Sequence, residues 1–442
     1  MIRAGFARQV INNELGTEIQ GVHNNNTVQY IRDDLEANVM WLESDGTGIL
    51  FITVDLGALL LDYIDRILPD IAEAAGIGRD CILIGCSHTH STPSVIQTHP
   101  NKPVDDAYHE RLRAWLCEAA SEAVSSAEQV RIAWGRGEAE IGYNRRVCYA
   151  DGTHIMHGDA NREDATGLEG MSDPRQVALF VQDMDGKLKA ILQHNTAHPI
   201  NFYARDFLSA DFPGLSRKFL RDVLGDIEVL YFNGAQGDIS VFDEHWKDVA
   251  PETAEQRVAR AAHLMTGETL RLLQHADYKD EIDIGHAQLH YDVKLRPMSD
   301  EHLAWAKATM DAHEIQPGEK SWDLDLLNAY MALTYHEQFG DRETETIDLH
   351  AGHVDGLAFV TSPCEMFTHF ALQVKRRSPF PATAFFGLTN GQMGYCPTME
   401  GVLGGHHEGT VKYTSRWDVT AGYLITDELA RMLYTLHRES GR

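Results

Sequence analysis

Residues 48–85 have the sequence GILFITVDLGALLLDYIDRILPDIAEAAGIGRDCILIG, which contains the clearest folding pattern in the chain. Gly48 to Asp55 is a short apolar run rich in β-branched and aromatic residues, and this composition predicts a buried strand. Apolar residues recur at helical spacing over Leu59 to Ala75, and Cys81 to Gly85 is a second apolar run. The order strand, helix, strand predicts a βαβ unit with two parallel strands.

The same alternation continues along the chain and predicts an α/β fold with mixed β-sheets flanked by helices. Further strands are predicted at Gln129 to Trp134, Val177 to Gln182, Leu188 to Gln193, Glu228 to Phe232, Gly356 to Thr361 and Ala384 to Gly387. Further helices are predicted at Asp106 to Ala127, Pro213 to Val223, Ala254 to Gln274, Asp300 to His313, Leu324 to Glu337 and Ala421 to Leu436. We expect a single domain over residues 1–442, with a helix-rich lobe at about 296–345.

The composition restricts the partners and the compartment. Acidic residues outnumber basic ones by 66 to 38, and the formal net charge is -28. This charge repels phosphate backbones and anionic headgroups, so we expect neither nucleic acid nor a stable membrane association. The 6 cysteines form no CxxC pair, which favours reduced thiols in a cytosol. We see no export leader and no uncharged run long enough for a membrane span, and therefore expect a cytoplasmic protein.

Polar residues gather directly after the predicted strands. Five such loops are Ser87 to His90, Asn195 to Pro199, Asn233 to Ser240, Pro363 to Glu365 and Thr389 to Tyr395. In open α/β sheets, active sites form beyond the carboxyl ends of the strands. We therefore expect these loops to meet at one site, although they are far apart in sequence.

Histidines in two of these loops suggest a metal site. His88 and His90 are two residues apart, so both imidazoles lie on one face if the segment is extended. One metal could bind both, or one histidine could bind it while the other handles protons. His198 precedes Pro199, which restricts its backbone to extended conformations. Imidazole is the commonest zinc ligand, and catalytic zinc takes three protein ligands and a water.

A third ligand is needed, and Glu365 is a candidate because it follows an apolar strand and a proline. The alternative is an acid at the start of a helix through Phe370, where the helix dipole favours it.

Asp211, before Pro213, has the pattern of a helix start. The glycines of Asn233 to Ser240 indicate a turn that exposes backbone N–H groups.

In this order, the motifs resemble the catalytic domain of the neutral, non-lysosomal ceramidases. Nine segments carry the resemblance: Ala4 to Ala7 (AGxA), Val54-Asp55 (VSxD), Ser87 to Ser91 (THTHSGPG), Asn144-Arg145 (NRSP), Ala197 to Pro199 (ACHP), Ser209 to Gly214 (SADYPG), Asn233 to Ser240 (QGxxGDVSP), Pro363 to Glu365 (PGEP) and Gly394 to Thr398 (YxxT). The match extends to about Gly409, so residues 1–442 are expected to form the catalytic domain without a C-terminal immunoglobulin-like domain.

The resemblance implies one zinc per chain with four ligands: His88, His198, Glu365 and Tyr395. It places His90 and Arg145 on the substrate side. Ser240 matches a serine for which a nucleophilic or a supporting role is conceivable, and we prefer the supporting role because nothing near it in sequence is an obvious base.

The sequence departs from the family pattern at two places. His90 to Ser94 lacks two glycines of the family motif, which narrows the approach to the site. His407, with His406 as an alternate, stands where the family has a second tyrosine. An imidazole there would change charge near neutral pH, and activity should follow its titration.

These features predict a zinc-dependent hydrolase that cleaves the amide bond of a small acyl amide through metal-activated water. His90 or Tyr395 would pass the proton to the leaving amine, while Arg145 and His407 would hold the substrate or the oxyanion. The alternatives are a metal-dependent esterase or lactonase, a two-metal phosphoesterase, and a non-catalytic metal-containing binding module.

Overall fold

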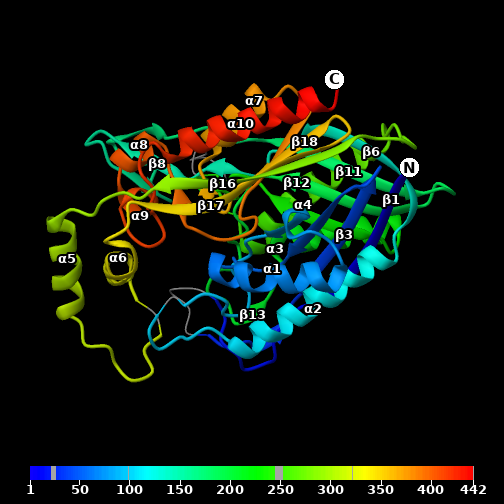
Figure 1. Ribbon diagram of the computed structural model, residues 1–442. Coiled ribbons are helices and arrows are strands. Elements are labelled where there is room, and N and C mark those ends of the chain that lie inside the picture. The colour runs from blue at the N-terminus through cyan, green and yellow to red at the C-terminus, as the bar shows by residue number, and fades with distance from the viewer. Residues whose placement is uncertain (21–25, 98, 244–251, 321, 442) are drawn as a thin grey trace.

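The computed structural model describes residues 1–20, 26–97, 99–243, 252–320 and 322–441. Mixed β-sheets form the centre of the molecule, and helices cover their outer faces (Figure 1). This arrangement confirms the predicted α/β class with mixed sheets flanked by helices. Among the described helices, none combines the length and the apolar composition that a membrane span needs.

The largest sheet has eight strands in the order β14-β12-β11-β6-β1-β3-β4-β5. Their bounds are β1 Ile2–Val10, β3 Glu36–Ser44, β4 Thr47–Val54, β5 Ile82–Cys86, β6 Glu128–Glu138, β11 Arg175–Asp183, β12 Leu188–Asn195 and β14 Glu228–Asn233. Strands β1 and β6 pair only at Arg3↔Gln129 and Ala4↔Glu128. The sheet therefore consists of two four-stranded halves that are joined at one short contact.

A second sheet has the order β16-β17-β18-β20, and the remaining strands form short ladders. The bounds of the second sheet are β16 Ile284–Lys294, β17 Thr344–Val354, β18 Leu357–Thr361 and β20 Ala382–Phe386. The short strands are β2 Tyr30–Ile31, β7 Tyr143–Asn144, β8 Arg146–Tyr149, β9 His154–Met156, β10 Ala165–Leu168, β13 Phe207–Leu208, β15 Ile239–Ser240, β19 Glu365–Met366 and β21 Tyr395–Cys396.

Apolar side chains from both halves and from the second sheet meet in one core. Phe51 of β4 packs edge-on against Phe232 of β14 and Phe359 of β18. Phe386 of β20 stacks on Phe232 with ring centroids 4.2 Å apart. Three sheet faces thus enclose a shared core, which brings strands β5, β14 and β20 together although they are far apart in sequence.

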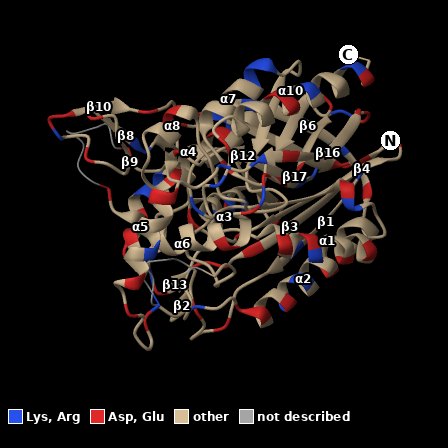
Figure 2. Ribbon diagram, turned by 60° about the vertical axis from the view of Figure 1, so that its left-hand side comes forward, with Lys and Arg blue, Asp and Glu red and all other residues tan. Residues whose placement is uncertain are grey.

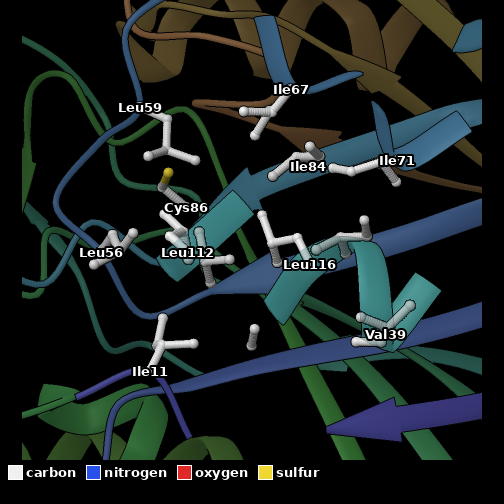
Figure 3. Close-up of a cluster of buried hydrophobic side chains, with 14 of the residues drawn as sticks. Ile11, Val39, Leu56, Leu59, Ile67, Ile71, Ile84, Cys86, Leu112 and Leu116 are labelled. Carbon is white, nitrogen blue, oxygen red and sulfur yellow. The ribbon is translucent and has the colours of Figure 1, made fainter. Parts of the chain in front are cut away.

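Helices cover each outer face in pairs. Helices α1 (Leu61–Ala75) and α2 (Asp106–Ser125) cover the β1 to β5 half, where Figure 3 shows their apolar side chains against those of the strands. Helices α3 (Asp211–Leu224) and α4 (Ala254–Leu273) cover the β6 to β14 half. Helices α7 (Thr368–Arg377) and α10 (Ala421–Glu439) cover the second sheet. The amphipathic helix after each strand run thus buries its apolar face on the sheet.

The segment predicted to be helix-rich contains α5 (Asp300–Asp311) and α6 (Leu324–Phe339). These two helices pack on each other through small residues that include Ala306, Ala329 and Ala332. They stand beside the sheets, as Figure 1 shows. Two short helices, α8 (Met399–Leu403) and α9 (His406–Gly409), follow β21. Figure 2 shows that acidic residues are spread over the outer helices and loops, in keeping with the net charge of -28.

Parallel strand pairs position the functional loops. Strands β4 and β5, β12 and β14, and β18 and β20 are parallel neighbours. All five polar loops predicted from the sequence leave the carboxyl ends of these strands. The alternative interpretation of Glu365 as an acid at a helix start is wrong, because Glu365 lies in strand β19 and α7 begins only at Thr368. Glu365 is therefore not an acid placed at a helix N-terminus.

Candidate metal centre

Three histidines converge where the loops after β5 and β12 meet. Nε2 of His88 lies 2.9 Å from Nε2 of His198 and 3.4 Å from Nε2 of His90. The ligand atoms of all three residues lie within 4.8 Å of one another, which makes them a possible metal site. The backbone N–H of His90 donates to the carbonyl of Pro199, so the two loops are also joined directly.

The backbone of His88 is not extended, and the sequence-based reason for its convergence with His90 was wrong. His88 has a φ of 72°, in the left-handed region that non-glycine residues rarely adopt. The backbone N–H of His88 donates to the carbonyl of Leu56, which holds this conformation. Strained residues of this kind persist where the surrounding structure fixes them, and they gather at functional sites.

Backbone carbonyls select the tautomer of both buried histidines. Nδ1 of His88 faces the carbonyl oxygen of Gly57, and Nδ1 of His198 lies 3.1 Å from the carbonyl oxygen of Gln236. Because a carbonyl oxygen only accepts, Nδ1 of His88 carries the proton and donates it. For His198, the contact of Nδ1 to the carbonyl is shorter than its 3.3 Å separation from Nη1 of Arg145, which favours the same tautomer. Both Nε2 atoms are then unprotonated lone-pair donors, 2.9 Å apart. Two lone pairs at this separation repel each other unless a cation lies between them.

Glu365 completes the group with a carboxylate. Its Oε1 accepts a hydrogen bond from Nε2 of Gln392 at 2.6 Å. Its Oε2 lies 3.4 Å from Nε2 of His88 and 3.6 Å from Nε2 of His198. This buried oxygen accepts no hydrogen bond within the described part of the chain. A buried carboxylate oxygen left without a donor is costly, and a bound cation would satisfy it.

The separations of these atoms fit a tetrahedral zinc site. Ligand atoms about 2.0–2.1 Å from a tetrahedral zinc stand about 3.3 Å apart. The observed separations among His88, His198 and Glu365 are 2.9, 3.4 and 3.6 Å. Burial opposes ionisation of Glu365, but its polar neighbours, with Arg145 and Gln392 among them, outweigh burial and lower the pKa of the carboxyl. The carboxylate is therefore charged at neutral pH, as a ligand must be.

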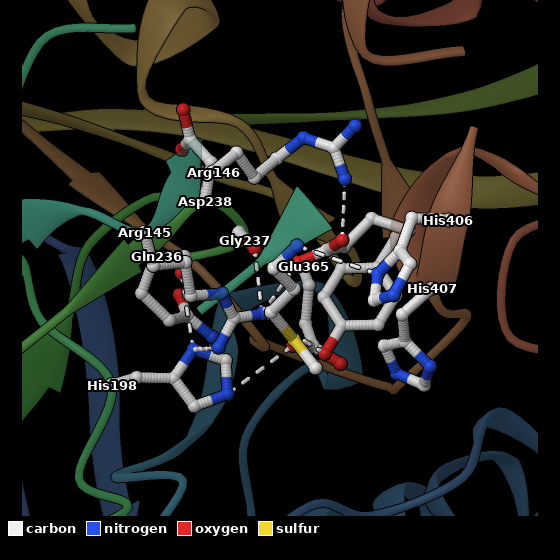
Figure 4. Close-up of polar contacts among 12 residues, drawn as sticks. Arg145, Arg146, His198, Gln236, Gly237, Asp238, Glu365, His406 and His407 are labelled. Atoms are coloured by element: carbon white, nitrogen blue, oxygen red, sulfur yellow. Dashed lines mark hydrogen bonds and ion pairs between the residues drawn. The ribbon is translucent and has the colours of Figure 1, made fainter. Parts of the chain in front are cut away.

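Arg145 is buried beside these ligands. Its guanidinium donates to the carbonyl of Gly237 at 2.9 Å (Figure 4). The same nitrogen, Nη2, also donates to the hydroxyl of Tyr395 at 3.3 Å. Nη1 of Arg145 also lies 3.3 Å from Nδ1 of His198. Burial and then this guanidinium hold the pKa of His198 well below its usual range, so the imidazole stays neutral and able to bind a metal.

Glu408, a residue that the sequence patterns did not indicate, holds the two arginines in place. Glu408 lies 3.3 Å from Nη2 of Arg145 and 2.5 Å from Nη1 of Arg146. Arg146 also donates to Glu169 at 2.7 Å, and the side chains of Arg146 and Glu408 are fully buried. The signal was present, since Glu408 stands next to His407, but only the histidine was considered.

Asp238 and Gly237 fasten the loop after β14, and this role also differs from the expected one. The Asp238 carboxylate accepts from Nδ2 of Asn144 at 2.8 Å and from the N–H of Thr368 at 2.7 Å. A Cβ on Gly237 would stand 2.4 Å from the carbonyl oxygen of Glu365. The glycine therefore allows close packing against β19, whereas we expected an exposed row of backbone N–H groups.

Ser240 lies beside the site without lining its cavity. Its backbone forms a bridge with that of His198, and its hydroxyl accepts the N–H of Phe242 at 3.2 Å. Asp211 begins α3 and accepts hydrogen bonds from the side chain and backbone of Asn201, which confirms the structural role that the sequence favoured.

His407, and not His406, lines the cavity beside the three histidines. The rings of His407 and Tyr395 are 5.4 Å apart, whereas Nδ1 of His406 accepts the N–H of Met156. Burial, followed by the charge of Lys412, holds the pKa of His407 well below its usual range. The imidazole is therefore neutral at physiological pH, and the titration expected near neutrality moves to lower pH.

The fold and the histidine group define a mixed α/β protein with a possible metal centre beyond the carboxyl ends of its strands. Among solved structures the chain is similar to neutral ceramidase from Pseudomonas aeruginosa, with a TM-score of 0.71 and 13% identity over 99% of this chain and 75% of that chain. A ceramidase described as complexed with C2 gives a TM-score of 0.72 and 12% identity over the same shares. No protein-family model matches the sequence. No curated protein matches it either. The resemblance stated from the sequence is thus confirmed at the level of the fold.

Proposed function

We propose that this protein is a zinc-dependent hydrolase that cleaves the amide bond of a small acyl amide. One observation carries the proposal: two unprotonated Nε2 atoms and the unpartnered Oε2 of Glu365 face one point. The likeness to ceramidase structures supports an amide as the substrate. The proposal includes one zinc ion per chain.

In this proposal His88, His198 and Glu365 hold the zinc, with Tyr395 beside them as the fourth group. Zinc at such a site acts as a Lewis acid and lowers the pKa of a water molecule to about 7. The carbonyls of Gly57 and Gln236 orient the imidazoles, since each accepts an Nδ1–H.

His90 is the residue that we assign to proton transfer. Within the described part of the chain its ring makes a hydrogen bond only to His88, so no carbonyl or carboxylate orients it as a ligand. It is also more exposed than His88 and His198 and lines the cavity. A neutral imidazole in this position can accept a proton at its unprotonated ring nitrogen and pass it to the nitrogen of the leaving amine. Arg145 and the Tyr395 hydroxyl, 3.3 Å apart, would stabilise the developing oxyanion.

A two-metal phosphoesterase is less well supported. Such a site needs a second metal with its own ligands and a bridging carboxylate. In the residues that the structure describes, His88, His90 and His198 are the single group of three or more metal-ligating side chains. An esterase or lactonase would use the same groups as an amidase, and a panel of amides, esters and lactones separates these activities.

Protein purified without chelators should contain about one zinc per chain, because imidazole and carboxylate ligands at these separations suit zinc better than magnesium. Metal analysis by mass spectrometry measures this, and removal of the metal should abolish amide hydrolysis until zinc is restored. Full activity in protein with less than about a tenth of an equivalent of any transition metal would rule the proposal out.

Ser240→Ala should keep its zinc and retain measurable turnover, because the hydroxyl accepts a backbone N–H and does not line the cavity. Metal content and kcat on an amide substrate are the measurements. Ser216→Ala, another buried serine, provides a matched control for packing. An acyl group trapped covalently on Ser240 would instead establish it as a nucleophile.

His407→Phe should lower kcat/KM by roughly 10²-fold, as expected for loss of one donor to the oxyanion. Nδ1 of His407 is buried without a hydrogen-bond partner among the described residues, and the residue lines the cavity, so its imidazole is available as a donor there. His407→Tyr restores a donor and should recover part of the activity. His406→Phe is the control and should change kcat/KM little. Unchanged kinetics in His407→Phe would limit this residue to packing.

A further inference from the structure

The cavity beside the metal centre is small and has two chemically different walls. Its volume is about 170 Å³, which is room for roughly six water-sized groups. Its polar lining includes His88, Glu365, Tyr395 and His407. The other wall is apolar and is formed by Ile96, Leu327 and Met331. Pockets for drug-sized ligands are about 300–1,000 Å³, so this partly open cavity is small by comparison.

Helix α6 from the helix-rich lobe supplies the apolar wall. Leu327 and Met331 are four residues apart and therefore lie on one face of the helix. The backbone carbonyl of Met331 accepts the N–H of Tyr413 at 3.0 Å, and its sulfur accepts the hydroxyl of Thr414 at 3.5 Å. The carbonyl of Thr414 in turn accepts the N–H of Tyr395 at 2.8 Å. Met331 is thus fixed relative to the metal centre.

A second cavity of about 490 Å³ begins on the other side of Met331. Ile96, Met331 and Gln392 line both cavities. The second cavity continues between the start of α1 and α6, where Leu61 and Phe339 line it. The side chains of Ile96, Met331 and Gln392 therefore lie between the space at the metal centre and a larger space. The lining of the larger space also includes the charged side chains of Asp62, Asp65, Glu345 and Arg416.

We propose that the site is specific for amides with a short, unbranched acyl group of about four to six carbons, and that Met331 sets this limit. The inference rests on the proposed amide hydrolysis. The scissile carbonyl must lie at the polar wall, so the chain attached to it extends to the apolar wall of α6. The leaving amine lies towards His90, the most exposed of the three histidines.

The test measures kcat/KM for N-acyl derivatives of one fluorogenic arylamine with acyl chains of 2 to about 16 carbons. In the wild-type protein kcat/KM should rise about three- to fourfold for each methylene that fits, up to about six carbons, and then fall. Met331→Ala joins the two cavities. The acyl chain length with the highest kcat/KM should therefore increase by two or more carbons. The ten-carbon amide should gain at least about tenfold relative to the four-carbon amide.

Two variants control for folding of the lobe. Met331→Leu conserves volume and should keep the wild-type profile. Met310→Ala removes a methionine that packs inside the same lobe away from the cavity, and it should also keep the profile. The inference would be overturned if kcat/KM of the wild type kept rising up to an acyl chain of about twelve carbons. It would also be overturned if kcat/KM depended on acyl chain length in the same way in Met331→Ala and in Met310→Ala.

Binding separates this inference from the proposed reaction. Calorimetry with zinc-loaded protein should show that hexanoate binds more tightly than dodecanoate to the wild type, and that Met331→Ala reverses the order. If no amide is cleaved but this order holds, the proposed function fails and the size limit stands. If amides are cleaved but dodecanoate binds the wild type more tightly, the size limit is wrong.

Discussion

His88→Ala and His198→Ala should each lose the zinc and lower kcat/KM by about 10³-fold or more, because the metal supplies several kcal/mol of transition-state stabilisation. Both imidazoles have their Nδ1 bound to a backbone carbonyl and their Nε2 directed at the same point. Removal of either one leaves a single imidazole and Glu365, too few ligands for tight binding. Zinc content and kcat/KM are measured on the same preparations. His369→Ala, on the exposed side of α7, is the control.

Two further variants should have different effects on zinc binding and on turnover. Gln392→Leu removes the donor that orients Glu365, and loss of such a supporting group typically weakens metal binding about 10- to 100-fold. His90→Ala should retain zinc and lose turnover, because His90 is assigned to proton transfer. A zinc-free His90→Ala would place His90 among the ligands. Stoichiometric zinc in His88→Ala would show that the metal binds elsewhere.

Glu408→Ala should lower the free energy of unfolding by about 3–5 kcal/mol, because it leaves Arg145 and Arg146 buried without their shared carboxylate. Urea denaturation monitored by circular dichroism measures the loss. The control is an exposed ion pair, in which Nη2 of Arg162 lies 2.6 Å from Oδ2 of Asp164. Arg162→Ala should cost no more than about 1 kcal/mol. Equal losses in the two variants would contradict the role of Glu408.

The Glu408 network also predicts how stability depends on pH. Burial opposes ionisation of Glu408, but Arg145 and Arg146 outweigh it and lower the pKa of the carboxyl. A depressed pKa contributes stability above the unfolded value of about 4.3, and that contribution is lost as the pH falls through the folded value. Glu408→Gln should therefore show less loss of stability in acid than the wild type. A pH dependence that matches the wild type would assign acid sensitivity to other carboxyls.

The sequence located much of the candidate site because loop positions follow from local patterns. Periodicity identified the strands that end before His88, His198 and Glu365, and parallel pairing brings such ends to one edge. The family motifs added Arg145 and Tyr395. The helix expected from Glu365 was wrong, because its pairing with β21 depends on a segment thirty residues later, which local preference does not encode.

The sequence by itself determined the α/β class, the strands that carry the site loops and the residue types at their ends, because these depend on neighbouring residues and their spacing. It did not indicate β1, β3, β16 and β17, which form much of the two main sheets. Only the tertiary structure decided which groups act on each other. The tautomers of His88 and His198 depend on backbone carbonyls, which have no residue signature. The ion pair of Arg145 with Glu408 joins two segments that are far apart in the sequence. Met331, which lines the cavity, comes from the helix-rich lobe. Such contacts arise from packing in three dimensions, and no periodicity along the chain records them.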